Sequence, residues 1–139
     1  FAANDGLPAG SKNVRQIAAD AGDNAIAIVN GSLFYSSGGA WSAVTLPAPI
    51  NSAGDSPAPP TGSNVIEAVD GAGGSIFNVL MTDTIGGSGR AWVLTSNGED
   101  PTLASSWSSV AVRNSLNGYA ITAYDISSRY GTVYVVGTS

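Results

Sequence analysis

The segment Val14-Arg-Gln-Ile-Ala-Ala-Asp20 recurs twice in altered form in this chain, as Asn64-Val-Ile-Glu-Ala-Val-Asp70 and Tyr119-Ala-Ile-Thr-Ala-Tyr-Asp125. Each copy ends in Asp and carries Ala two positions before it, and the three Asp residues are 50 and then 55 positions apart. Self-similarity at a fixed period is typical of proteins built from repeated structural units. The sequence therefore predicts a repeated unit with a period of about fifty residues.

Each of these segments is followed by a short turn and then by a strongly apolar run. A continuous apolar run rich in β-branched residues indicates a β-strand that is buried on both faces. The three runs are Ala25-Ile-Ala-Ile-Val29, Ile76-Phe-Asn-Val-Leu-Met81 and Thr132-Val-Tyr-Val-Val136. In the first unit Asn30-Gly31 follows the run, and because Asn-Gly is the preferred pair for a two-residue turn, we predict a tight hairpin there.

A third and a fourth strand complete the unit in its first two copies. The third strands are Leu33-Phe-Tyr35 and Ala91-Trp-Val-Leu94, and the fourth strands begin at Trp41 and Trp107. A sheet whose inner strands are apolar on both faces must be covered on both faces, and a β-propeller achieves this by stacking further copies around an axis. The sequence therefore predicts an all-β fold of four-stranded antiparallel blades of a β-propeller, with a β-sandwich as the alternative.

The predicted units cover residues 14–47, 64–113 and 119–139 of a single β domain or propeller fragment that spans residues 1–139. They amount to about two and a half units, whereas propellers have 4–8 blades. Unpaired strand edges are templates for pairing with another chain. We therefore expect the partners to be the rest of a longer chain or other subunits that complete the sheet.

Charge excludes several classes of function. Only 11% of the residues are charged, and the net charge is −5. The few basic residues are scattered along the chain and no apolar run is long enough for a membrane span, so we expect no nucleic-acid partner and no membrane insertion. Solubility then depends on Ser, Thr, Asn and Gly, which suits extracellular proteins and virion or cell-surface components. We predict that localisation.

Cysteine and histidine are absent from the chain. Disulfides, thiolate nucleophiles and Cys-ligated zinc sites are thereby excluded, as are mechanisms that use His as a base or a metal ligand. The cluster Asp20-Ala-Gly-Asp23-Asn24 has too few ligands for a calcium loop. We therefore predict no metal site, no cofactor and no enzymatic activity.

One stretch resembles a known repeat. Val29-Asn-Gly-Ser-Leu-Phe-Tyr-Ser-Ser-Gly-Gly-Ala-Trp-Ser-Ala-Val-Thr-Leu-Pro47 is similar to blades of the Asp-box (BNR) propellers, a group that includes sialidases and photosystem assembly factors. The Asp that defines those blades is missing here, because the turn Ser36–Trp41 is one residue shorter and contains no acidic residue. Tectonin and Kelch blades are nearly as similar. The resemblance implies a propeller architecture.

The resemblance also implies a test for sialidase chemistry, which uses an arginine cluster and a Tyr nucleophile with a Glu partner. Arg15, Arg90, Arg113 and Arg129 fall at unequal places in the repeat, and no Tyr is placed to act with Glu67. A fragment of a sialidase-like glycoside hydrolase is therefore the last of the functional alternatives.

Five repeated residues have expected structural roles. Trp41 and Trp107 begin equivalent strands, so we expect both to pack against a neighbouring unit, with a sugar-stacking platform as the alternative. Asp20, Asp70 and Asp125 each follow a first strand. A carboxylate in that position can accept backbone N–H bonds and stabilise a turn.

Two enlarged loops are the predicted place of function. The interval from the repeat Asp to the Trp is 21 residues in the first unit and 37 in the second, and the extra residues fall in Thr82–Arg90 and Ser96–Ser106. Loops enlarged on a regular scaffold are a usual place for recognition. The candidate binding residues are Arg90, Glu99 and Asp100. We predict a non-catalytic extracellular binding or assembly module that recognises glycan or a protein surface; the alternative is a structural component of a virion, tail fibre or surface filament.

Overall fold

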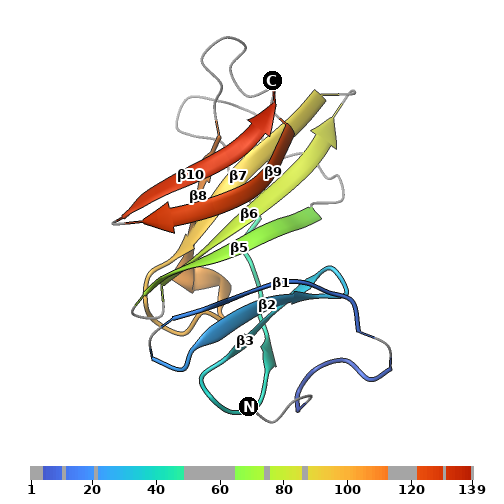
Figure 1. Cartoon of the computed structure of the whole chain (residues 1–139), viewed down its shortest axis with the longest axis vertical. Coiled ribbons are helices and arrows are strands. Elements are labelled where there is room, and N and C mark those ends of the chain that lie inside the picture. Colours follow the sequence, from blue (N-terminus) through green and yellow to red (C-terminus); the bar gives the residue numbers. More distant parts are fainter. Residues whose placement is uncertain are drawn as a thin grey trace.

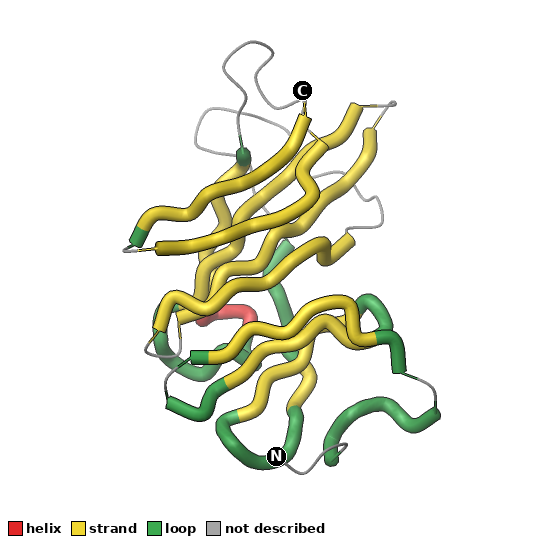
Figure 2. Tube along the Cα trace, viewed as in Figure 1, coloured by secondary structure: helices red, strands yellow, loops and turns green. Residues whose placement is uncertain are grey.

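A computed structural model describes residues 5–10, 12–20, 22–48, 65–73, 76–85, 88–112, 122–129 and 131–138. Within these residues the chain forms ten strands and one short 3-10 helix (Figures 1 and 2). The strands make three antiparallel sheets that follow one another along the chain. The predicted all-β class and the four-stranded antiparallel sheet are therefore confirmed.

Sheet 1 is a meander of four strands in the order β1-β2-β3-β4. Its strands are β1 (Val14–Ala19), β2 (Ala25–Val29), β3 (Ser32–Ser36) and β4 (Ser42–Ala43). Asn30 and Gly31 join β2 to β3 with φ angles of 51° and 78°, in the left-handed region that the predicted two-residue turn requires. The tight hairpin is therefore confirmed.

Sheet 2 repeats this meander in the order β5-β6-β7-β8. Its strands are β5 (Val65–Gly73), β6 (Ile76–Ile85), β7 (Ser88–Ser96) and β8 (Trp107–Ala111), and the 3-10 helix η1 (Ala104–Ser106) precedes β8. The loop predicted at Thr82–Arg90 is wrong, since pairing of β6 with β7 continues from Asn78↔Thr95 out to Ile85↔Ser88. The extra residues lengthen a hairpin instead of forming a recognition loop.

Sheet 3 has two strands within the described residues, β9 (Thr122–Arg129) and β10 (Thr132–Thr138). The prediction that the second strand of each unit is buried on both faces holds for β2, in which every residue is buried, but is wrong for β10. Tyr134 is 59% exposed and Val136 is 63% exposed. They are exposed because the described chain contains no layer beyond sheet 3.

The three sheets are stacked, with sheet 2 between the other two (Figure 1). One core lies between sheets 1 and 2, where Ile26 and Ile28 of β2 meet Phe77 and Trp92 of sheet 2. A second core lies between sheets 2 and 3 and includes Leu80. Sheet 2 is thus apolar on both faces.

The first strands of successive sheets approach each other closely, β1 against β5 and β5 against β9. A Cβ atom added to Gly71 of β5 would lie 3.0 Å from the carbonyl oxygen of Ala19, at the end of β1. Only a residue without a side chain allows this approach without displacing the neighbouring backbone. Small residues therefore set the spacing where the sheets converge.

Replacing Phe77 by Ala tests the core between sheets 1 and 2. The Phe77 side chain is fully buried, and its ring meets Tyr35 edge to face with centroids 6.0 Å apart. We expect the free energy of unfolding to fall by about 3–5 kcal/mol, measured by urea denaturation, because the change removes buried apolar surface and leaves a cavity. Leu103→Ala, at a residue that is 52% exposed, is the matched control and should cost under about 0.5 kcal/mol. Equal losses in the two variants would contradict the stacked arrangement.

Candidate functional site

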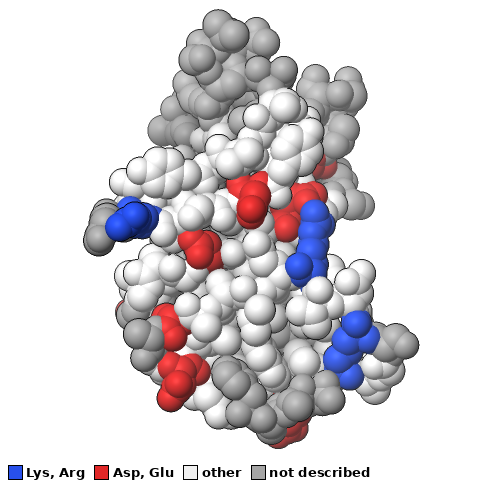
Figure 3. Space-filling model, in the orientation of Figure 1, with Lys and Arg blue, Asp and Glu red and all other residues white. Residues whose placement is uncertain are grey.

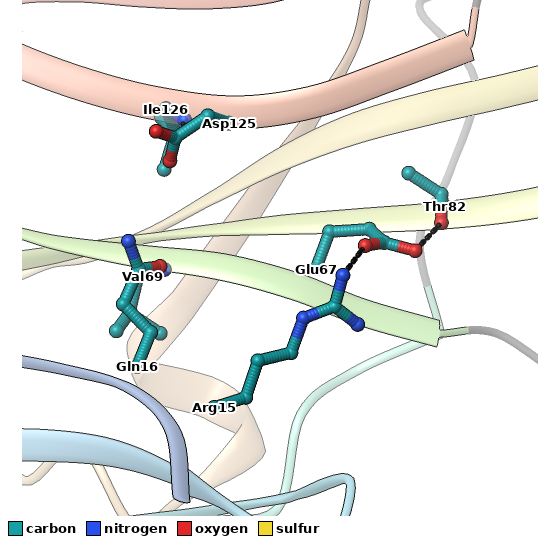
Figure 4. Close-up of polar contacts among 7 residues, drawn as sticks. All are labelled: Arg15, Gln16, Glu67, Val69, Thr82, Asp125 and Ile126. Carbon is teal, nitrogen blue, oxygen red and sulfur yellow. Dashed lines mark hydrogen bonds and ion pairs between the residues drawn. The ribbon is translucent and has the colours of Figure 1, made fainter.

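Polar contacts join the first strands of sheets 1 and 2 (Figure 4). Arg15 of β1 forms an ion pair with Glu67 of β5, and the other oxygen of Glu67 accepts a hydrogen bond from the Thr82 hydroxyl at 3.1 Å. The Gln16 side-chain oxygen accepts the Val69 N–H at 2.7 Å. Because the Arg15 side chain is 49% exposed, the ion pair stabilises the fold by at most about 1 kcal/mol. These contacts align the two sheets.

The three repeat Asp residues do not occupy equivalent positions. Asp20 follows β1, and its Oδ1 accepts the N–H groups of Gly22 at 2.7 Å and Asn24 at 3.1 Å, which is the geometry expected of a turn. Asp70 and Asp125 lie inside β5 and β9, so the turns predicted at these two positions are wrong. Both strands continue past the Asp because the residues that follow still find cross-strand partners.

Asp70 links sheet 2 to sheet 3. One of its oxygens accepts hydrogen bonds from both the N–H and the hydroxyl of Ser128 in β9, the latter at 2.8 Å, and the other accepts the Gly71 N–H. Asp125 accepts the N–H of Ile126 at 2.8 Å (Figure 4 shows this pair). At position 70, a strand residue that hydrogen-bonds to the next sheet thus replaces the expected turn.

The two tryptophans for which the sequence predicts a structural role, Trp41 and Trp107, are both buried. Trp41 is 8% exposed and packs with Phe34 and Leu7 on the face of sheet 1 that points away from sheet 2. Trp107 is 7% exposed in the core between sheets 1 and 2, and its indole N–H donates to the Pro101 carbonyl at 2.8 Å. A sugar-stacking platform needs an open ring face, so the burial of both rings favours the structural role.

The three candidate binding residues are not brought together. Arg90 lies in β7, opposite Asp83 of β6, whereas Glu99 and Asp100 lie in the loop that follows the far end of β7. That loop is anchored by backbone hydrogen bonds from Asn97 N–H to the Ser106 carbonyl and from Thr45 N–H to the Thr102 carbonyl. It is therefore held against sheet 1 in a defined position.

This loop and the β3–β4 hairpin border a cavity of about 420 Å³. Hydroxyl and carboxylate groups dominate its lining, which suits a ligand with several hydroxyl groups. The lining residues are Tyr35, Ser37, Ala40, Ser42, Glu99, Asp100, Pro101 and Thr102. The Tyr35 hydroxyl donates to the Asn24 side-chain oxygen at 3.0 Å, which orients the ring at the cavity wall.

A second cavity, of about 490 Å³, is apolar and lies between sheets 2 and 3. Its lining consists of Val93, Thr95, Val110, Ala111, Val112, Val133 and Val135. A third cavity, of about 370 Å³, shares Thr95 and Val133 with it and adds polar groups of Asn78 and Ser128. We call the second cavity the valine groove.

The two ends of the stack carry exposed apolar side chains. On sheet 3, Tyr124 is 56% exposed and lies on the outer surface with Tyr134 and Val136. On sheet 1, Val14 and Ile17 of β1 are 53% and 57% exposed. Charged side chains are scattered over the face shown in Figure 3, and most of that surface carries neither sign.

Sequence reasoning missed two features of the interior. Asp83 is a buried carboxylate, 5% exposed, on the same face of β6 as Val79 and Met81. Alternation along Phe77, Val79, Met81 and Asp83 is the signal that places it in a strand, and the assumed loop at Thr82–Arg90 hid that signal. The valine groove was also missed. It forms where sheet 2 extends beyond the edge of sheet 3, and this depends on the relative widths of two sheets.

Arg113 lies outside the described residues. In the described part of the chain, no group of three or more acidic side chains is placed to hold a metal ion. No helix among these residues is long and apolar enough to span a membrane. Comparison of the chain with protein-family models, with curated proteins and with solved structures finds no match.

Replacing Thr102 by Val tests the geometry of the loop that carries Asp100. The Thr102 hydroxyl and N–H donate to Asp100 Oδ1 at 2.7 and 2.9 Å, and these hydrogen bonds hold the pKa of Asp100 below its ordinary value of 3.8. Thr102→Val removes the larger effect, so the pKa should rise toward 3.8 in a carboxyl ¹³C NMR titration.

The sign of the linkage follows from the lowered pKa. Because Asp100 binds its proton more weakly in the folded state, these hydrogen bonds stabilise the loop above about pH 4, and the stabilisation is lost as the pH falls through the folded-state pKa. Ser108→Ala, at an exposed residue of β8, is the control and should leave the titration of Asp100 unchanged. An unchanged pKa in Thr102→Val would show that the Asp100–Thr102 hydrogen bond is not formed in solution.

Proposed function

We propose that this protein is a non-catalytic extracellular module of the β-propeller type that binds a protein surface and acts in assembly. The observation that carries the proposal is the open outer face of sheet 3. Tyr124, Tyr134 and Val136 are each more than half exposed on one two-stranded surface. Contiguous exposed apolar groups mark interaction sites, and tyrosine is enriched at the core of protein interfaces.

The equivalent packing of Leu46 and Leu7 supports a propeller-type arrangement. Leu46, just before Pro47, packs against the core between sheets 1 and 2, and Leu7, just before Pro8, packs on the opposite face of sheet 1. Trp107 and Trp41 occupy the same two cores in the same way. Sheets 1 and 2 therefore present equivalent residues on equivalent faces, as repeated stacking requires.

The two open ends favour head-to-tail contact. The outer face of sheet 3 is at one end of the stack, and exposed Val14 and Ile17 are at the other. Surfaces that differ from each other and lie at opposite ends generate rings or filaments when copies associate. This supports assembly as the role and agrees with the alternative of a structural component in a surface filament.

Support for a non-catalytic role comes from Glu67, the acidic residue considered for hydrolysis. One of its oxygens pairs with Arg15 and the other accepts the Thr82 hydroxyl. Arg15 is thereby engaged in joining two sheets instead of standing in a cleft for a substrate carboxylate.

Tyr134→Lys tests the assembly role. We expect the wild-type protein to show concentration-dependent association by light scattering, and we expect the variant to associate at least tenfold more weakly, because a charge on an apolar interface must be desolvated. Leu103→Lys is the matched control, since Leu103 is similarly exposed but lies in the loop before η1. A wild-type protein that stays monomeric at all concentrations would refute the head-to-tail role.

Glycan recognition is a second candidate, and the cavity beside Glu99 and Asp100 favours it. Its wall combines two carboxylates, several hydroxyls and the ring of Tyr35, and its loop is anchored before any ligand binds. Such groups recognise polar ligands through hydrogen bonds.

Ser42→Trp tests this second role by filling the cavity without removing a contact of the loop. If the cavity binds glycan, a glycan array should show at least one ligand for the wild-type protein, and Ser42→Trp should abolish its signal. Ser108→Trp, on the exposed side of β8, places the same ring outside this cavity and should retain the signal. Signals that persist in Ser42→Trp would place glycan binding elsewhere.

A further inference from the structure

In one cross-strand row of sheet 2, the side chains become more exposed from β5 at one edge of the sheet to β8 at the other. Ala68, Leu80, Val93 and Val110 are directly opposite one another on β5, β6, β7 and β8. Ala68 and Leu80 are 1% and 0% exposed, Val93 is half-buried, and Val110 is 63% exposed. Sheet 3 therefore covers the first half of this face and leaves β8 uncovered.

The opposite face of sheet 2 is covered over β6, β7 and β8. There Met81, Trp92 and Ala111 form a row across β6, β7 and β8 and are 5%, 0% and 7% exposed. Sheet 1, with four strands, provides this cover. The two faces differ because one neighbouring sheet has four strands and the other has two within the described residues.

The valine groove lies where the missing cover would be. Val93, Val110 and Val112 form its floor, and Val133 and Val135 of β10 form its wall. Among the described residues no strand pairs with the outer edge of β10. An exposed edge can add a further strand through backbone hydrogen bonds, while a neighbouring apolar surface receives its side chains.

We propose that the valine groove binds an apolar β-hairpin of a partner protein, which pairs with β10 and completes sheet 3 to four strands. This inference rests on the proposed assembly function and names the kind of partner. The new interface would continue the core that already joins sheets 2 and 3, in which Leu80 and Ile126 are packed. The partner adds to an existing interface instead of creating a separate one.

Sheet 2 shows what chemistry the hairpin needs. Its own third and fourth strands present Trp92, Leu94, Trp107 and Ala111 toward sheet 1. A hairpin with the same alternation of aromatic and aliphatic residues on one face would cover Val93 and Val110. At the end of the groove near Asn78 and Thr95 the lining stays mostly apolar but includes these two side chains, which hydrogen-bond to each other, so the site accepts a ligand residue with a polar group there.

Symmetric pairing of β10 with β10 of a second copy does not fit this site. Antiparallel pairing of two identical strands through a twofold axis puts the same face of both molecules on one side of the joined sheet. Sheet 2 of each molecule extends past β10 on that side, so the two projecting parts would overlap. Symmetric pairing of β10 with β10 therefore does not fill the groove.

The experiment uses the full chain and a synthetic hairpin in which an Asn-Gly turn joins residues 88–96 to residues 107–112. Calorimetric titration should show binding to the wild-type protein, and NMR should show shifts of the Val93 and Val133 methyl groups. Val110→Lys should weaken binding at least tenfold and leave folding intact, because Val110 is exposed. Leu103→Lys should bind as the wild type does, and a hairpin with Ser in place of both Trp residues should not bind.

Three results would overturn the inference: no binding of the hairpin by the wild-type protein, equal binding by Val110→Lys, or methyl shifts confined to residues outside the groove. Light scattering of Val110→Lys without the peptide tests whether a second copy of the chain occupies the groove instead. If this change alone converts an oligomer to a monomer, a second copy fills the groove and the inference fails. Tyr134→Lys, on the other side of sheet 3, should keep hairpin binding, so loss of assembly and loss of hairpin binding are distinguishable.

Discussion

The structure depends on one constraint, which is that sheet 2 is apolar on both faces and must be covered on both. Leu80 and Val79 are neighbours on β6, point to opposite faces and are both fully buried. Neither sheet 1 nor sheet 3 alone can provide this burial. The stack of sheets therefore follows from the apolar second strand of sheet 2, β6, which is buried by a sheet on either side.

Polar groups determine how the stacked sheets are aligned. Apolar contacts alone would let one sheet slide over the next, whereas the hydrogen bonds Gln16–Val69 and Asp70–Ser128 each join a particular pair of positions on adjacent first strands. Gly71 lets the backbones approach at the same edge. The sheets therefore converge at their first strands. The anchored loop and its polar cavity lie at the other edge, near β4 and η1.

Much of the fold could be predicted from the sequence, because strand order and burial follow from local apolar patterns. The apolar run Ala25–Val29 coincides with β2 residue for residue, and Asn30-Gly31 determines its hairpin. The candidate sites are harder to predict from the sequence, since they depend on contacts between units. Asp70 was expected at a turn by its likeness to Asp20, but the residues after it pair with β6 and the strand continues. The exposure of Val110 depends on where sheet 3 ends, which no local pattern records.

The repeat allows the exposed apolar residues of sheets 2 and 3 to be compared with equivalent positions in other sheets. Exposed valines and tyrosines are common on single proteins, and one at a time they indicate little. Here Val110 lies on β8, whose other face buries Trp107 and Ala111, and Tyr134 lies on a second strand whose equivalents in β2 and β6 are buried. Since the same unit buries these positions wherever a neighbouring sheet is present, their exposure marks the faces of sheets 2 and 3 that no sheet of the described chain covers.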